Sequence, residues 1–148
     1  RAAVVRERIL ADLLDNARRC AIAFDPAELQ RLTGTAADAG TTTYRAVKDR
    51  LMRFQAVDPD VRFVYIFRHL PQRDEVIFLA DSATPGDKDE SKPGDVYKEA
   101  KGSPGLQAII ADGRPATEGR ASKFDASSLR TGIAMQNLTE GRRTYCRA

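Results

Sequence analysis

Four side chains in the middle of the chain have types and spacing suited to holding a small ligand. Arg68 and Asp81 close two short apolar runs within residues 61–82. A guanidinium group can hold a carboxylate through two parallel hydrogen bonds, and the Asp81 carboxylate can pair with an amine. Tyr65 and Tyr97 add hydroxyl groups and aromatic ring faces. We therefore take Tyr65, Arg68, Asp81 and Tyr97 as candidate ligand-binding residues.

The same residues also have a purely structural explanation. Arg68 and Asp81 would pair with each other across a hairpin, while Tyr65 and Tyr97 would pack in the core. Charges at strand ends are ordinarily solvated or paired with each other. The residues alone leave both explanations open.

Other groups of residues lack the spacing that chemistry requires. Residues 87–95 are rich in acids but lack the ligand alternation of a calcium-binding loop, and His69 has no nucleophile in a recognisable arrangement. Cys20 and Cys146 belong to no CxxC motif and the chain has no HExxH motif. An oxidising compartment would allow a disulfide between them, and two separate thiols are the alternative. The sequence predicts no catalytic residue, no metal site and no cofactor.

The composition is that of a globular chain with mixed charges. Its 148 residues are 42% hydrophobic and 30% charged, with a net charge of +3, which indicates one domain. No apolar run approaches the ~18 residues of a membrane span, and residues 1–24 are too charged for a signal peptide. Basic residues alternate with acidic ones, unlike the basic face of a nucleic-acid-binding protein. Because the chain begins at Arg1, we expect a piece of a longer protein, with any membrane anchor outside it.

The N-terminal part, residues 1–57, has helical periodicity. Apolar residues spaced three and four apart over residues 4–24 predict a long amphipathic helix. Asp25 and Pro26 suit the N-cap and the first position of a short second helix. A third helix is predicted over residues 41–57, with a threonine near its cap and a stop at the DPD sequence that follows.

The apolar period changes to two in the middle of the chain. One face of the first predicted strand carries Val61, Phe63, Tyr65 and Phe67, and the other carries Arg62, Val64, Ile66 and Arg68. Residues 76–79 continue the alternation after a polar turn, so we predict an antiparallel hairpin packed on both faces. Residues 82–95 form a polar loop of a length that is typically functional or disordered.

The remaining segments complete an α+β organisation. Two short helices are predicted over residues 95–101 and 104–113, with Gly113 as a C-cap. The pattern then weakens, and residues 127–138 and 142–148 are candidate strands around a turn. We predict a long N-terminal helix and a helical layer packed on a central antiparallel sheet. The single domain would comprise a helical part (1–57), a sheet core with its loop or lid (58–118) and a C-terminal segment (119–148).

The order of these segments resembles a known family. An N-terminal helix, a helical layer, VRFVYIFR, VIFLADS, an acidic Pro-Gly loop and PGDVYKEA with a short helix after it occur together. This order resembles the extracytoplasmic PAS-like sensor domains, of single Cache type, of bacterial membrane-bound signalling proteins. The resemblance covers residues 1–118 and is most specific over residues 61–100. Many relatives close the sheet with a Trp-containing strand pair, whereas this sequence has no Trp, so residues 119–148 are atypical.

The resemblance implies a PAS-like sheet and a sensory function. Such domains lie ahead of a histidine kinase, a diguanylate cyclase or a chemoreceptor module, in the periplasmic or extracellular portion of an inner-membrane protein, as in two-component systems. The implied partners are a small-molecule ligand, such as an amino acid or a carboxylate, and a second copy of the chain in a homodimer through the N-terminal helix. No enzymatic activity of the domain and no binding of nucleic acid are implied.

Two other functions compete with sensing. A structural or dimerisation module would hold helices together with the same fold and without a small ligand. A small enzyme has the least support, because no nucleophile with its base is recognisable. A cavity with convergent polar groups is the feature that distinguishes a sensor from a structural module.

Overall fold

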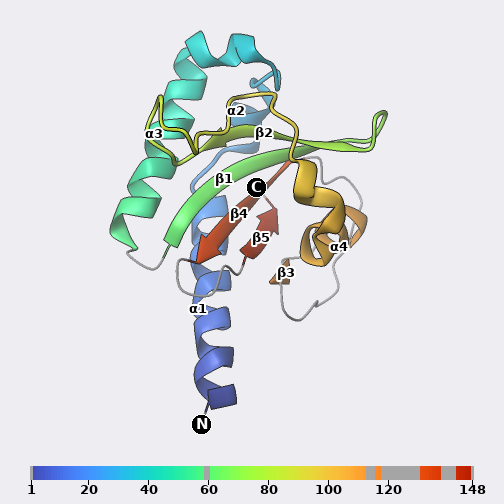
Figure 1. Ribbon diagram of the computed structural model, residues 1–148. Helices are drawn as coiled ribbons and strands as arrows, with labels where there is room; N and C mark the ends of the chain where they lie inside the picture. Colours follow the sequence, from blue (N-terminus) through green and yellow to red (C-terminus); the bar gives the residue numbers. More distant parts are fainter. Residues whose placement is uncertain (1, 59–60, 113–115, 118–130, 138–142, 148) are drawn as a thin grey trace.

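The computed structural model describes residues 2–58, 61–112, 116–117, 131–137 and 143–147 (Figure 1). Its long helices and its hairpin lie where the spacing of apolar residues predicts them. The architecture is α+β, as predicted. The helices are α1 (Ala2–Ile22), α2 (Pro26–Gln30), α3 (Thr42–Val57), α4 (Pro104–Asp112) and the 3₁₀ helices η1 (Ala36–Gly40) and η2 (Lys98–Gly102). The strands are β1 (Val61–Leu70), β2 (Glu75–Asp81), β3 (Ala116–Thr117), β4 (Thr131–Asn137) and β5 (Arg143–Arg147).

The starts of α2 and α3 follow the predicted capping residues. The Asp25 carboxylate accepts a hydrogen bond from the backbone N–H of Ala27 at 2.9 Å, and Pro26 occupies the first turn of α2. The Thr41 hydroxyl oxygen accepts from the backbone N–H of Tyr44 at 3.1 Å. Both side chains satisfy N–H groups that a helix leaves without a partner in its first turn.

The strands form one antiparallel sheet in the order β2-β1-β4-β5-β3. In the predicted hairpin, Tyr65 lies opposite Asp81 and Arg68 lies opposite Ile77. The register shifts between Ile66 and Phe67, where β2 has one extra residue. The hairpin therefore turns Asp81 toward the same face as Tyr65, at the end of β2.

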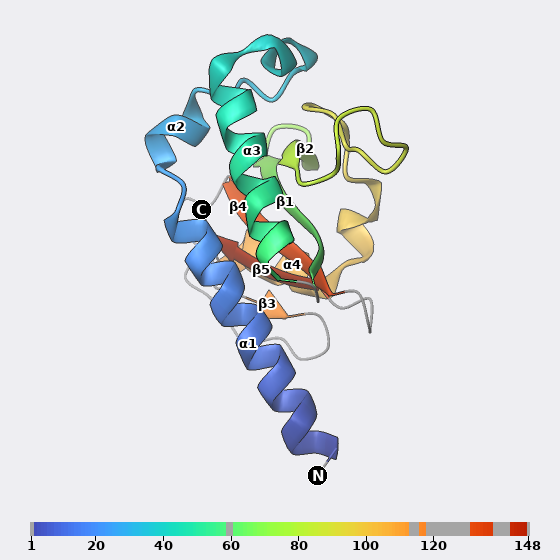
Figure 2. The ribbon, with the colours of Figure 1, turned by 90° about the vertical axis from the view of Figure 1, so that its left-hand side faces the viewer.

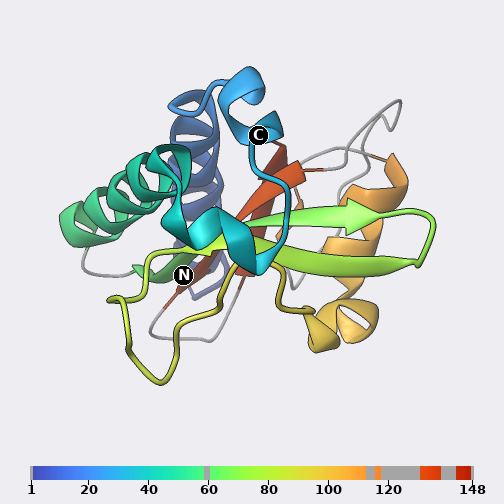
Figure 3. The ribbon, with the colours of Figure 1, turned by 90° about the horizontal axis from the view of Figure 1, so that it is seen from above.

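Apolar side chains pack on both faces of the sheet, as the alternation in the hairpin predicts. On one face α1, α2 and α3 cover a cluster that includes Cys20, Phe24, Leu51, Val64 and Leu79. On the other face η2 and α4 cover a smaller cluster of Tyr65, Phe67, Val76, Tyr97, Ala100, Leu106 and Ile109. Figures 2 and 3 show the two sets of helices on opposite sides of the strands.

Residues 82–95, which we call the roof segment, leave the end of β2 without helix or strand structure and return along its edge. The backbone N–H of Gly94 donates to the Phe78 carbonyl at 2.9 Å, and the N–H of Phe78 donates to the Asp95 carbonyl at 2.9 Å. The N–H of Tyr97 then donates to the Val76 carbonyl at 2.7 Å. These bonds fix the second half of the roof segment, and Tyr97 after it, against β2.

Three of the local predictions need correction. Val61 packs with Val64 and Ile66 in the larger cluster and not on the face of Tyr65, because the pairing of β1 with β4 shifts register between Val61 and Phe63. The segment predicted as a helix over residues 95–101 is the 3₁₀ helix η2, which begins at Lys98. The small-residue connection after α2 contains η1, which was not predicted. Candidate strands near the C-terminus contain β4 and β5, and β4 pairs directly with β1. The predicted Gly113 cap and the turn between these strands lie outside the described residues.

The amphipathic helix predicted over residues 4–24 is α1. Its first turns extend past the end of the sheet, as Figures 1 and 2 show, and its second half packs in the core through Ala17 and Cys20. Among the described residues, no helix combines the length and the apolar character required to cross a membrane.

Candidate functional site

Strand alternation separates the four predicted ligand-binding residues. Tyr65 and Asp81 are cross-strand neighbours on one face of the hairpin. Arg68 is three positions beyond Tyr65, and an odd spacing along a strand places a side chain on the opposite face. The same alternation in the sequence already opposed Tyr65 to Arg68, so the four residues cannot all line one pocket on the sheet.

A cavity of about 180 Å³ lies between the sheet and the roof segment. We call it the sheet pocket, and it is lined by Phe63, Tyr65, Phe78, Asp81, Asp89, Ser91, Tyr97 and Glu99. Three of the predicted residues, Tyr65, Asp81 and Tyr97, therefore meet at one site. The roof segment supplies Asp89, which the sequence suggested only as part of a rejected calcium loop, and Ser91, which sequence reasoning did not single out.

Aromatic rings form the walls of the sheet pocket. The hydroxyl oxygens of Tyr65 and Tyr97 lie 3.2 Å apart, and their rings meet edge to face with centroids 5.8 Å apart. Phe78 completes the group, with its ring centroid 5.4 Å from that of Tyr65 and 4.9 Å from that of Tyr97. Contacts of this kind hold the rings in place, so this wall is preformed.

Asp81 is buried at the end of β2, where three groups bond to its carboxylate. Lys48 Nζ lies 3.1 Å from Oδ1, which also accepts from the N–H of Ala83 at 3.2 Å. The N–H of Ser91, in the roof segment, donates to Oδ2 at 2.6 Å. The charged partner of Asp81 is therefore Lys48 of α3, and the suggested Arg68–Asp81 pair is wrong.

Lys48 is the functional candidate that sequence reasoning missed. Its residue exposure is only 5%, and its Nζ lies 3.0 Å from Oε2 of Glu90 as well as 3.1 Å from Asp81. Burial alone would lower the pKa of Lys48, but the hydrogen bond with Glu90 and the charge of Asp81 outweigh it and raise that pKa. We call Lys48, Asp81 and Glu90 the charge cluster. It ties α3 to β2 and to the roof segment.

A signal for Lys48 was present in the sequence. The buried residues of α3 are Tyr44, Val47, Lys48 and Leu51, and their spacing of three and four defines one face of the helix. A lysine on such an apolar face must extend to solvent or meet a buried acid. The sequence did not reveal which acid Lys48 meets, because Asp81 lies at the far end of the hairpin and Glu90 lies within the roof segment.

Arg68 lies on the opposite face of the sheet, beside α2. Its guanidinium donates to the backbone carbonyls of Leu32 at 2.7 Å and of Leu29 at 2.9 Å. Burial lowers the pKa of Arg68, and the nearby charge of Asp38 opposes the shift. These contacts anchor the chain that follows α2, so Arg68 has a structural part in the described fold and does not line the sheet pocket.

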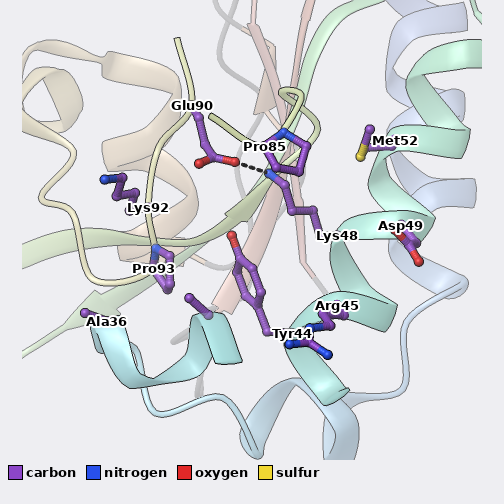
Figure 4. A pocket seen from close by; sticks show the side chains of 11 residues that line it. Ala36, Tyr44, Arg45, Lys48, Asp49, Met52, Pro85, Glu90, Lys92 and Pro93 are labelled. Carbon is purple, nitrogen blue, oxygen red and sulfur yellow. Dashed lines mark ion pairs between the residues drawn. The ribbon is translucent and has the colours of Figure 1, made fainter. Parts of the chain in front are cut away.

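A larger cavity lies on the other side of the roof segment. We call it the outer cavity; it measures about 450 Å³ and is shown in Figure 4. It is lined by Ala36, Ala39, Tyr44, Arg45, Lys48, Asp49, Met52, Pro85, Glu90, Lys92 and Pro93. Figure 4 shows Lys48 reaching from α3 to Glu90 at its inner end. Charges of both signs line it, so its chemistry is less selective than that of the sheet pocket.

Residues 89–92 of the roof segment separate the two cavities. Asp89 and Ser91 line the sheet pocket, whereas Glu90 and Lys92 line the outer cavity. The charge cluster lies between them, because Asp81 lines the first cavity while Lys48 and Glu90 line the second. The ion pairs of Lys48 with Asp81 and Glu90 therefore lie between the two cavities.

Two other residues considered in the sequence, His69 and Cys20, lie apart from this site. His69 Nε2 lies 3.2 Å from Oδ1 of Asp74, at the hairpin turn. Among the described residues, no three His, Cys, Asp or Glu side chains are arranged to hold a metal ion. Cys20 is buried in the larger core cluster, and the side chain of Cys146 is outside the described part of the chain.

No protein-family model, curated protein or solved structure matches this chain. A functional assignment therefore depends on the geometry of the sheet pocket, the outer cavity and the charge cluster.

Proposed function

We propose that this chain is the extracytoplasmic ligand-sensing domain of a bacterial transmembrane signalling protein. The observation that carries the proposal is the sheet pocket, in which Tyr65, Asp81 and Tyr97 converge beneath a roof without regular structure. A preformed cavity with a few convergent polar groups is the usual form of a small-molecule site. The resemblance of the segment order to PAS-like, single Cache-type domains agrees with this function, and we extend the proposal to a PAS-like sheet.

The charge cluster supplies a route from ligand to helix. Asp81 lines the sheet pocket and pairs with Lys48 of α3, and the same Lys48 pairs with Glu90 of the roof segment. A ligand that binds to the Asp81 carboxylate would weaken the ion pair between Asp81 and Lys48. The ligand changes the equilibrium between two arrangements only by the difference in its affinity for them. In the full-length protein, α1 would carry the resulting shift toward the membrane within a homodimer.

The competing function is a structural or dimerisation module. Such a module needs no cavity and would fill the space over the sheet with side chains. The sheet pocket and the outer cavity favour sensing. We therefore keep the structural module as the outcome that a negative ligand screen would support.

Thermal unfolding in the presence of small amines, amino acids and carboxylates tests the proposal. A ligand that binds the folded chain raises Tm as its concentration rises. Ser91→Trp should fill the sheet pocket and abolish the shift, whereas Lys92→Trp, one residue away and facing the outer cavity, should retain it. The sensor proposal is overturned if no compound of a broad screen raises Tm, or if both variants respond like the wild type.

A further inference from the structure

Aromatic and acidic side chains dominate the lining of the sheet pocket. Of the eight described residues that line it, four are aromatic and three are acidic, and none carries a positive charge. The aromatic residues are Phe63, Tyr65, Phe78 and Tyr97, and the acidic residues are Asp81, Asp89 and Glu99. Asp81 is at the buried end, whereas Asp89 and Glu99 are exposed.

This combination selects for a cation on two physical grounds. An aromatic ring has a negative face that attracts a cation within ~6 Å of its centroid. Carboxylates attract the same cation and repel an anion, most strongly where the site excludes water. The Arg62 guanidinium lies 5.2 Å from the Phe63 ring centroid, so a ligand cation would share the attraction of this ring with Arg62.

At the buried end of the pocket, a ligand cation would compete with Lys48 for the Asp81 carboxylate. The Asp81 carboxylate is shared between Lys48 and two backbone N–H groups. A second cation close to Asp81 would compete with Lys48 for the same negative charge. An anion would be repelled by the exposed Asp89 and Glu99 and by Asp81 at the buried end, where Lys48 offsets part of the negative charge.

We propose that the sheet pocket binds a small organic amine in its cationic form, with the ammonium group among the aromatic rings and facing Asp81. This inference names the ligand class of the proposed sensor and rests on that proposal. The pocket, at about 180 Å³, is smaller than the ~300 Å³ at which cavities for drug-sized ligands begin. A compact alkylammonium fits this volume, and an amino acid would place its carboxylate outward, away from Asp81.

The outer cavity does not have this selectivity. Its lining includes three basic residues, Arg45, Lys48 and Lys92, beside the acidic Asp49 and Glu90. A small cation there would be repelled by more charges than would attract it. The two cavities therefore differ in the sign of the charge that they favour, and this difference allows a direct test.

Calorimetric titration with matched probes tests the inference. The probes are choline, its neutral isostere 3,3-dimethylbutan-1-ol, butylamine and butyrate. We expect choline and butylamine to bind and butyrate not to bind, with choline at least about tenfold tighter than the neutral isostere. Rising salt should weaken the binding, because two of the carboxylates are exposed.

Variants place the probe in the sheet pocket. Asp89→Asn with Glu99→Gln removes two exposed charges and should weaken choline binding about fivefold or more. Asp49→Asn, at an exposed carboxylate of the outer cavity, should leave choline binding unchanged. Phe63→Leu keeps an apolar side chain but removes a ring. It should therefore reduce the difference in affinity between choline and the neutral isostere.

The outcomes separate this inference from the sensor proposal. Binding of butyrate or of the neutral isostere without binding of amines, lost in Ser91→Trp, would overturn the amine inference and leave the sensor proposal standing. Choline binding that is lost in Asp49→Asn and kept in the double variant would place the ligand in the outer cavity and also overturn the inference. Failure of both amines to bind at all would overturn it too, and the broad thermal screen then decides whether the chain binds any ligand.

Discussion

At the scale of single residues, Lys48 connects parts of the chain that are distant in sequence. It extends from the buried face of α3 to two carboxylates, one at the end of β2 and one in the roof segment. Taking three charges out of water is costly, and the arrangement persists only because the charges satisfy one another. Removing one member is therefore far more damaging than removing an exposed ion pair.

Replacing Lys48 by methionine should destabilise the chain strongly. The substitution keeps much of the side-chain volume but leaves the buried Asp81 and the half-buried Glu90 without their cation. We expect the free energy of unfolding to fall by about 3–5 kcal/mol, as when one partner of a buried pair is removed. Chemical denaturation followed by circular dichroism measures the loss. Lys92→Met, at an exposed lysine that also lines the outer cavity, is the control. Equal stability of the two variants would contradict the assigned ion pairs of Lys48.

At the scale of elements, the connection between α2 and α3 is organised by one buried acid. Asp38 lies in η1 with an exposure of 2%. Its carboxylate accepts from the backbone N–H and the hydroxyl of Thr33, at 2.9 and 2.8 Å, and from the N–H of Gly34 at 2.8 Å. Gly94 packs against this turn with a φ of +93°, which suits glycine. A Cβ at this position would lie only 3.0 Å from the Gly34 carbonyl oxygen, so a side chain would crowd the turn. The roof segment therefore packs, through Gly94, against the turn that the hydrogen bonds of Asp38 stabilise.

The stability of the chain should depend on the ionisation of Asp38. Burial alone would raise the pKa of Asp38, but the hydrogen bonds from Thr33 and Gly34 outweigh it and lower that pKa below its ordinary 3.8. A lowered pKa contributes stability that is complete above 3.8 and is lost as pH falls through the folded-state value. Asp38→Asn should therefore reduce stability at neutral pH and flatten its decline in acid.

Denaturation curves across the acidic range measure this effect. The exposed Asp49→Asn serves as the control, and it should reproduce the wild-type dependence on pH. An Asp38→Asn chain whose stability declines in acid as steeply as that of the wild type would show that the Asp38 hydrogen bonds do not carry the dependence.

The elements themselves were largely readable from the sequence, because their signals are local. Asp25 and Thr41 mark helix starts, and the alternation from Val61 onward marks the hairpin. The site was readable only in part. Tyr65 and Asp81 meet because of hairpin register, which the alternation specifies, and this rule also excludes Arg68. The contact of Lys48 with Asp81 spans 33 positions, and no local pattern predicts which acid the lysine meets. The roof segment has no helix or strand period, so its place over the pocket was not readable either.

At the scale of the whole molecule, α1 is the element that the proposed homodimer would use. Its first turns extend past the sheet, and Val4 there is 68% exposed. The proposed dimer through α1 predicts that Val4→Asp lowers the self-association of the chain, because a charge would replace an apolar contact. Val57→Asp, at a position 79% exposed near the end of α3, is the matched control and should leave association unchanged. Sedimentation velocity over a range of concentrations measures the effect, and equal association of both variants would move the interface away from α1.

The backbone bonds between the roof segment and β2 determine how the sheet pocket can open. The second half of the roof supplies Gly94 and Asp95 to the outer edge of β2, and Tyr97 adds a further bond beyond it. Detaching this half would expose an unpaired strand edge that invites pairing with other chains. Ser82, at the start of the roof segment, is likewise bonded to Val64 of β1 through its N–H and its hydroxyl oxygen. We therefore expect any opening of the sheet pocket to be confined to residues 84–92, and such an opening would leave the outer edge of β2 covered.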